Sequence, residues 1–163
     1  QALSARPLRT IPGGQSQFDI APVTNGQYRW CVEAGRCSEP VPSLSTYFGD
    51  VADLAVTGVD ALQAQRYCAW LGRRLPYWTE WQLVNTARQS SADSGEIQGL
   101  TKDLEEWTAT AWPTRTVMWD GQTATIPKYL IEVGTNLTAL GAQATVEFRR
   151  ASLGFRCALD VAK

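Results

Sequence analysis

The stretch YCAWLGRRLP, residues Tyr67–Pro76, followed by TEW at Thr79–Trp81, carries most of the information about the fold. Apolar side chains up to Leu71 recur at helical spacing and form one face, so a helix is predicted there. Gly72 ends that helix, because glycine adopts the left-handed conformation of a helix C-cap without steric cost. Pro76 then restarts the chain in an extended conformation.

Three capping boxes predict where helices begin. They are TNGQ at Thr24–Gln27, DALQ at Asp60–Gln63 and TEWQ at Thr79–Gln82. In such a box the first side chain accepts a hydrogen bond from the amide three residues on, and the fourth side chain bonds back to the first amide. The first box predicts a helix over about residues 25–34, the second opens the helix that Gly72 ends, and the third opens a helix to about Arg88.

The second half of the chain is predicted to consist mostly of strands. The segment Val117–Ala124 has the pattern of a hairpin whose type I′ turn is Asp120-Gly121. Other strands are expected at Glu106–Thr108, Tyr129–Val133, Ala144–Phe148 and Gly154–Leu159. In the last of these, alternation would place Phe155 inward and Arg156 outward. Because helices come first and strands later, the predicted class is α+β, in a single domain.

Composition excludes several functional classes. The 163 residues carry 15 Lys and Arg against 16 Asp and Glu, a formal net charge of −1, without the basic excess of a nucleic-acid binder. No apolar run is long enough to insert across a membrane. There is no histidine, which removes Ser–His and Cys–His nucleophiles and histidine metal sites. The 4 cysteines contain no C-x-x-C pair, so a zinc ribbon is not favoured.

Four elements carry a family resemblance. They are PVTNGQY at Pro22–Tyr28, the stretch from Tyr67 to Trp81, EWT at Glu106–Thr108 and LGFRCA at Leu153–Ala158. Together, in this order, they resemble the formylglycine-generating enzyme, or sulfatase-modifying factor, family. The resemblance implies a C-type-lectin-like variant fold, with helices and long loops around a small twisted antiparallel sheet. We expect one such domain over residues 1–163; since the chain begins with Gln1, we expect a processed product or a piece of a larger protein.

The resemblance also indicates what is missing. Enzymes of this family oxidise a sulfatase cysteine to formylglycine with a copper-binding cysteine pair, between the Glu-Trp-Thr and Gly-Phe-Arg elements. Here that interval, Ala109–Leu153, has no cysteine, and Val133–Asn136 stands where the family has Gly-Gly-Ser. The histidine ligands of iron-dependent members are absent too. We therefore expect no catalytic residue and a non-catalytic recognition or scaffold domain; the alternatives are an oxidoreductase of the same family with altered chemistry and a purely structural subunit.

The family pattern implies a disulfide between Cys68 and Cys157. Cys31 and Cys37 flank Gly35 and could form a second, local disulfide at a helix end. The alternative is four buried free thiols in a reducing compartment. Two disulfides would slightly favour an extracytoplasmic location.

No cofactor is required on this reading, but the resemblance suggests a calcium site at Asp103 and Glu106, whose oxygen ligands suit calcium. The alternatives are a solvated acidic turn or a Glu106 that caps backbone amides.

A ligand, either a protein or a small molecule, would bind the family's variable segment, residues 109–152. Aromatic and arginine side chains are the usual anchors of recognition sites. The candidate residues are Trp112, Arg115, Trp119, Tyr129, Asn136, Arg149 and Arg150.

The alternative for these residues is that the tryptophans are core and the arginines are solvated or paired internally. Such a domain is expected to belong to a larger signalling, effector or surface protein.

Overall fold

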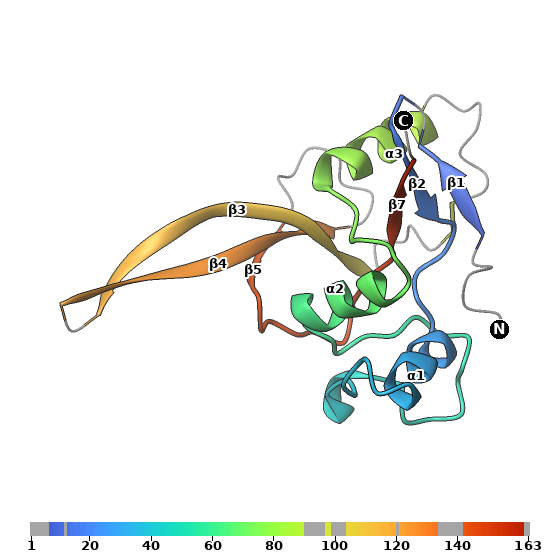
Figure 1. Cartoon of the computed structure of the whole chain (residues 1–163), viewed down its shortest axis with the longest axis horizontal. Helices are drawn as coiled ribbons and strands as arrows, with labels where there is room; N and C mark the ends of the chain where they lie inside the picture. The colour runs from blue at the N-terminus through green and yellow to red at the C-terminus, as the bar shows by residue number, and fades with distance from the viewer. Residues whose placement is uncertain are drawn as a thin grey trace.

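Three α-helices and two small sheets organise the chain in the computed structural model, which describes residues 7–11, 13–89, 97–98, 104–119, 121–133 and 142–161 (Figure 1). The helices are α1 (Asn25–Glu33), α2 (Ala61–Trp70) and α3 (Trp78–Gln89), with a short 3₁₀ turn, η2, at Pro42–Leu44. None of the helices in this described part combines the length and apolarity that crossing a membrane requires.

The first sheet joins the two ends of the chain. It has the order β1 (Leu8–Thr10), β2 (Ser16–Asp19), β7 (Ala158–Asp160), and both pairings are antiparallel. The second has the order β5 (Ala142–Thr145), β4 (Gln122–Val133), β3 (Glu105–Trp119), β6 (Leu153–Gly154). It is antiparallel except for the short parallel pairing of β3 with β6. This mixed architecture confirms the α+β prediction.

Two of the three predicted capping boxes are confirmed. Thr24 opens α1 with Gln27, and Asp60 opens α2 with Gln63, both with the reciprocal hydrogen bonds. The third box was placed wrongly, because α3 begins at Trp78 and Glu80 accepts the backbone amide of Tyr77 at 2.7 Å. Glu80 is therefore the third residue of the helix, and its carboxylate bonds back to the amide of the residue that precedes α3, as the fourth residue of a capping box does.

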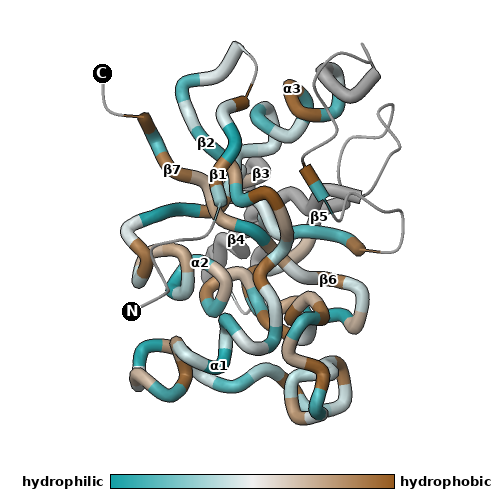
Figure 2. The backbone as a smooth tube through the Cα atoms, turned by 90° about the vertical axis from the view of Figure 1, so that its right-hand side faces the viewer, coloured by the Kyte–Doolittle hydropathy of each residue, from teal (hydrophilic) through white to brown (hydrophobic). Residues whose placement is uncertain are grey.

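The core lies where α1, α2 and the base of β3 meet. Tyr28, Tyr67 and Phe155 are fully buried and their rings are in mutual contact, with centroids 5.4–6.2 Å apart. Trp107 is buried beside them and its indole nitrogen donates to the Val59 carbonyl at 3.0 Å. Both views place α2 between α1 and the β1–β2–β7 sheet (Figures 1 and 2). The apolar helical face predicted from Tyr67 is therefore central to the molecule.

The C-terminal segment corrects one prediction. Gly154–Leu159 is not one strand: β6 ends at Gly154 and β7 begins at Ala158. Alternation therefore does not govern the residues between them, and Phe155 and Arg156 are both fully buried. Arg156 turns inward because a buried carboxylate, Glu106, lies there to pair with it.

The β3–β4 hairpin is confirmed and is longer than the sequence predicts. Trp119 pairs with Gln122 across a two-residue connection, and Gly121 has a φ of 73°. Asp120, the other residue of the predicted type I′ turn, lies outside the described residues. The register shifts twice along the hairpin, which indicates bulges. Figure 1 shows the hairpin extending well away from the helices, and we call its outer part, residues 111–119 with 122–129, the arm.

Candidate functional site

The predicted ligand residues fall into two groups. Trp112, Arg115 and Trp119 lie along β3 in the arm, opposite Lys128, Ile126 and Gln122. Tyr129, Arg149 and Arg150 lie at the base of the arm or in the chain that follows β5. Asn136 lies outside the described residues. Tyr129 pairs with Ala111, next to Trp112, whereas Arg115 and Trp119 lie farther out along β3.

The base group is engaged inside the molecule. Tyr129 is partly buried against the main core. Arg149 donates to the Asp60 carboxylate at 2.5 Å, which ties it to the capping box of α2. Arg150 pairs with Glu105 at 2.8 Å, although its side chain is still 52% exposed. Both arginines are therefore paired internally, which is the alternative that the sequence left open. Of the two, Arg150 keeps the larger exposed surface for a ligand.

A buried ion pair replaces a simple acidic turn at the start of β3. The guanidinium of Arg156 donates to both oxygens of Glu106, at 2.8 and 2.7 Å, and also to the carbonyls of Asp19, Ile20 and Gln98. Its guanidinium carbon lies 4.8 Å from the centre of the Trp81 ring. Arg156 thus ties three distant segments together. The sequence offered one hint of this, since both residues belong to the elements that carry the family resemblance.

The calcium prediction stays untested. Glu106 uses both carboxylate oxygens on Arg156, and Asp103 lies outside the described residues. Within the described ranges there is no group of three or more His, Cys, Asp or Glu residues arranged to hold a metal ion.

A second charged pair lies near the first and was not predicted. Arg73 donates to Asp19 at 2.5 Å, and the other oxygen of Asp19 accepts the backbone amide of Cys157 at 2.9 Å. Both side chains are nearly inaccessible to water. The carboxylate of Asp19, at the end of β2, therefore joins Arg73, which follows α2, to the backbone of the last segment of the chain.

Arg74 links α3 to β7 at the surface. It pairs with Glu80 at 2.7 Å and with Asp160 at 2.5 Å. Burial alone would raise the pKa of the Glu80 carboxyl, but hydrogen bonds from Arg74 and Ser16 outweigh it and lower that pKa. This network holds the helix that begins at Trp78 against the β1–β2–β7 sheet.

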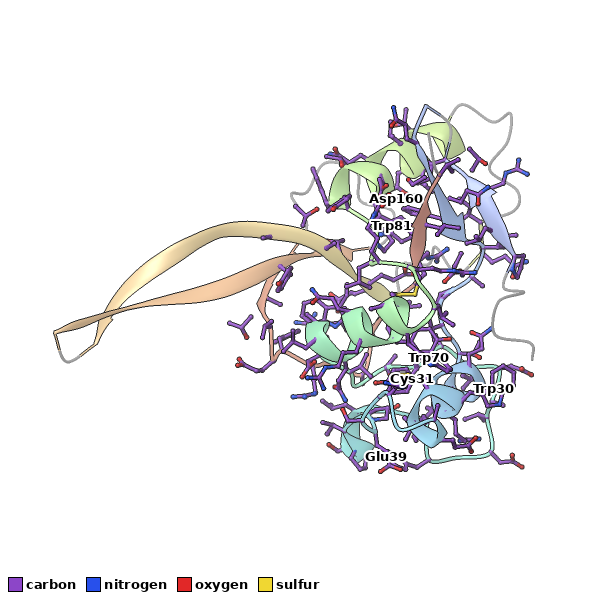
Figure 3. The ribbon with its side chains drawn as sticks, in the orientation of Figure 1. Trp30, Cys31, Glu39, Trp70, Trp81 and Asp160 are labelled. Carbon is purple, nitrogen blue, oxygen red and sulfur yellow. A yellow bond between two sulfur atoms is a disulfide. The ribbon has the colours of Figure 1, made fainter. Side chains whose placement is uncertain are left out.

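Both disulfides are present. Cys68 pairs with Cys157 across 89 residues, and Cys31 pairs with Cys37 across 6. Figure 3 shows the sulfur bond between α2 and the chain that leads to β7. These are the 4 cysteines of the chain, and none is free. The pairing that the resemblance implied is confirmed, and no thiol remains to bind a metal or act as a nucleophile.

Two solved structures resemble the chain in fold. The crystal structure of CarF matches with a TM-score of 0.62 at 14% identity, covering 90% of this chain and 87% of that one. The U1 variant of the major tropism determinant matches with a TM-score of 0.52, also at 14% identity. That match covers 95% of this chain but 52% of the other, so this chain spans about half of that protein. At such identities the likeness establishes the fold alone.

Sequence comparison identifies the family. No curated protein matches the chain significantly. The profile of the sulfatase-modifying factor enzyme 1-like domain matches residues 6–95, more than half of the chain. The matched region contains all of α1, α2 and α3, including the stretch from Tyr67 to Trp81. The fold, a C-type-lectin-like variant of the formylglycine-generating enzyme type, is the one that the sequence predicts. The chain belongs to the family of sulfatase-modifying factor enzyme 1-like domains.

Proposed function

We propose that the chain is a non-catalytic recognition or scaffold domain that binds a protein or small ligand through residues 109–152, as part of a larger signalling, effector or surface protein. The arm carries this proposal. Among the described residues of the arm, Lys128 and Tyr129 also pair with β5, and the others pair only with the opposite strand of the hairpin. A two-stranded ribbon is only marginally stable in water, so a long one that extends from the core is well suited to be covered by a partner.

The residue types of the arm support recognition. Its sequence holds Trp112, Trp119 and Arg115, and these residue types dominate the binding energy of protein interfaces. The sequence from 111 to 129 carries Arg115, Lys128 and Asp120, so its formal net charge is +1. An acidic or aromatic partner surface would complement this composition.

The state of the cysteines supports a role without catalysis. Family chemistry needs thiolates that hold copper, and thiolate is the soft ligand suited to Cu(I). All 4 cysteines of the chain are tied up in disulfides that lie outside residues 109–153. Serine, threonine and asparagine oxygens in that interval are hard ligands and cannot replace them.

We predict that the chain does not generate formylglycine. The assay is incubation of the non-reduced protein with copper, oxygen and a peptide containing Cys-x-Pro-x-Arg, followed by mass spectrometry of the peptide. The expected conversion equals that of the no-protein control. Conversion above that control, abolished when Cys31 and Cys37 are both replaced by alanine, would disprove the non-catalytic assignment.

Two further observations fit an extracytoplasmic recognition domain. Disulfides persist in oxidising compartments, so two of them favour a location outside the cytoplasm. One protein of similar fold is named a tropism determinant, and its name supports recognition as a role for this fold.

The recognition role predicts a loss of binding on changing the arm. The double variant Trp112→Ala/Arg115→Ala is screened beside the wild-type chain on peptide and glycan arrays. We expect wild-type binders to lose at least about tenfold in affinity, because removal of two anchor residues costs about 2 kcal/mol or more.

The matched control is Trp30→Ala/Arg36→Ala, which removes the same residue types from exposed positions on or beside α1. Circular dichroism and thermal unfolding verify that both variants are folded. If the arm variant weakens none of the wild-type binders, the proposal is contradicted.

A further inference from the structure

A cavity of about 390 Å³ lies between α1 and the loop that follows it. Its lining residues are Arg29, Val32, Glu33, Glu39, Tyr47 and Phe48. Figure 3 places Glu39 at the end of the molecule away from α3 and Asp160. None of the lining residues belongs to the segment 109–152, so this cavity is independent of the proposed recognition surface.

The wall that carries Glu39 is held by the fold rather than by a ligand. The Cys31–Cys37 disulfide joins α1 to the chain just before Glu39. The side-chain amide of Gln63 on α2 donates to the Glu39 carbonyl at 2.9 Å and to the Ser38 hydroxyl at 3.0 Å. These bonds fix the backbone at Glu39 while its carboxylate stays exposed.

The aromatic part of the lining is also held in place. Tyr47 is 4% exposed, and its ring lies edge-on to that of Phe48, with centroids 4.9 Å apart. Arg29 donates to the Tyr47 carbonyl at 2.6 Å and lies 5.2 Å from the centre of its ring. Phe48 itself remains 49% exposed. The cavity therefore presents an uncovered aromatic ring on a preformed support, which lowers the cost of binding.

The charge of the cavity is unbalanced toward negative. Among the described residues, no ion pair or side-chain hydrogen bond engages the carboxylate of Glu33 or of Glu39. Arg29 is the one cation of the lining, so the lining has a net formal charge of −1, and the Arg29 guanidinium lies against the carbonyl and ring of Tyr47. The field of Glu39 reaches that ring: burial chiefly raises the pKa of the Tyr47 phenol, and the charge of Glu39 raises it further.

We propose that this cavity binds an organic cation with an apolar stem, such as a lysine side chain or a small alkylamine. The stem would lie on Val32 and Phe48, where a cation also gains from the face of the aromatic ring. The ammonium group would pair with Glu33 and Glu39. The volume suits one long side chain, since ligand cavities start at about 300 Å³. An anionic ligand would meet two unpaired carboxylates and is disfavoured.

The experiment is an NMR titration of the full chain with two blocked amino acids. N-acetyl-lysine methylamide is the probe, and N-acetyl-norleucine methylamide is the same stem without the charge. We expect the lysine probe to shift the amide signals of residues 29–33, 39, 47 and 48, and the norleucine probe to bind at least about fivefold more weakly. Equal shifts with both probes, or none with the lysine probe, would refute a cation site.

Variants locate the charge requirement. Glu39→Gln is expected to lower the affinity for the lysine probe about two- to fivefold, which is the range that exposed ion pairs contribute. Adding Glu33→Gln is expected to bring the loss of affinity to about tenfold. Phe48→Leu is expected to weaken it about two- to fivefold. The control Glu147→Gln removes an exposed carboxylate that does not line the cavity and should leave affinity unchanged. If Glu147→Gln weakens the probe as much as Glu39→Gln, the effect is general electrostatics and the site is disproved.

A third measurement distinguishes the two sources of such a cation. Cadaverine is compared with lysine inside a nine-residue peptide of otherwise neutral residues. Tighter binding of the peptide assigns the site to a protein partner, and equal affinity assigns it to small amines; both uphold the cation site.

Discussion

Replacing Arg156 by alanine is expected to lower the free energy of unfolding by about 3–5 kcal/mol, because it leaves the buried carboxylate of Glu106 without its partner. Arg156 is fully buried and donates to both Glu106 oxygens, so no water can take its place without opening the core. Equilibrium unfolding in urea, followed by tryptophan fluorescence, measures the change.

Two further variants keep this prediction testable if the alanine variant fails to fold. The control Arg66→Ala removes an exposed arginine from α2 and should change stability by less than about 0.5 kcal/mol. The double variant Glu106→Leu/Arg156→Met removes both charges and should regain part of the stability that Arg156→Ala loses. A double variant that is no more stable than the single one would show that the bonds of Arg156 to backbone carbonyls matter more than the ion pair.

The two disulfides are expected to differ in their contribution to stability. Removing the Cys68–Cys157 bond with a pair of alanines should cost about 4–5 kcal/mol, since it closes a loop of 89 residues and restricts the unfolded chain strongly. Removing Cys31–Cys37 in the same way should cost about 2 kcal/mol, because its loop spans only 6 residues.

Chemical unfolding of both alanine pairs without reductant tests this order. Each variant replaces one disulfide by two alanines; Cys31, Cys68 and Cys157 are fully buried and Cys37 is partly buried. Equal losses, or a larger loss for the short loop, would mean that native packing rather than loop closure determines the contribution.

The sequence predicts best where the determining contacts are local. Thr24 with Gln27 and Asp60 with Gln63 lie three residues apart, and the helix starts they define are confirmed. The turn at Gly121 likewise sets the register of the hairpin locally. Short-range hydrogen bonds of this kind depend little on the rest of the fold.

The rest depends on partners far away in the chain. Arg156 and Glu106 are 50 residues apart, and only the folded structure shows that Arg156 is turned inward. The length of the arm was missed because β3 contains Pro113 and two register shifts, which hide a continuous strand from a search for alternation. The cavity beside α1 was missed for the same reason: Glu39 and Phe48 lie in a loop without a periodic pattern.

The pairing of β2 with β7 bears on how the protein is made. Residues Ser16–Phe18 leave the ribosome early but pair with Ala158–Asp160, so the first sheet stays incomplete until nearly the whole domain has been synthesised. Contacts of such long sequence separation are also slow to form in a free chain. The short Cys31–Cys37 loop can close early, which leaves Cys68 as the unpaired one of the first three of these cysteines until Cys157 emerges. We expect this order of synthesis to limit wrong disulfides during biogenesis.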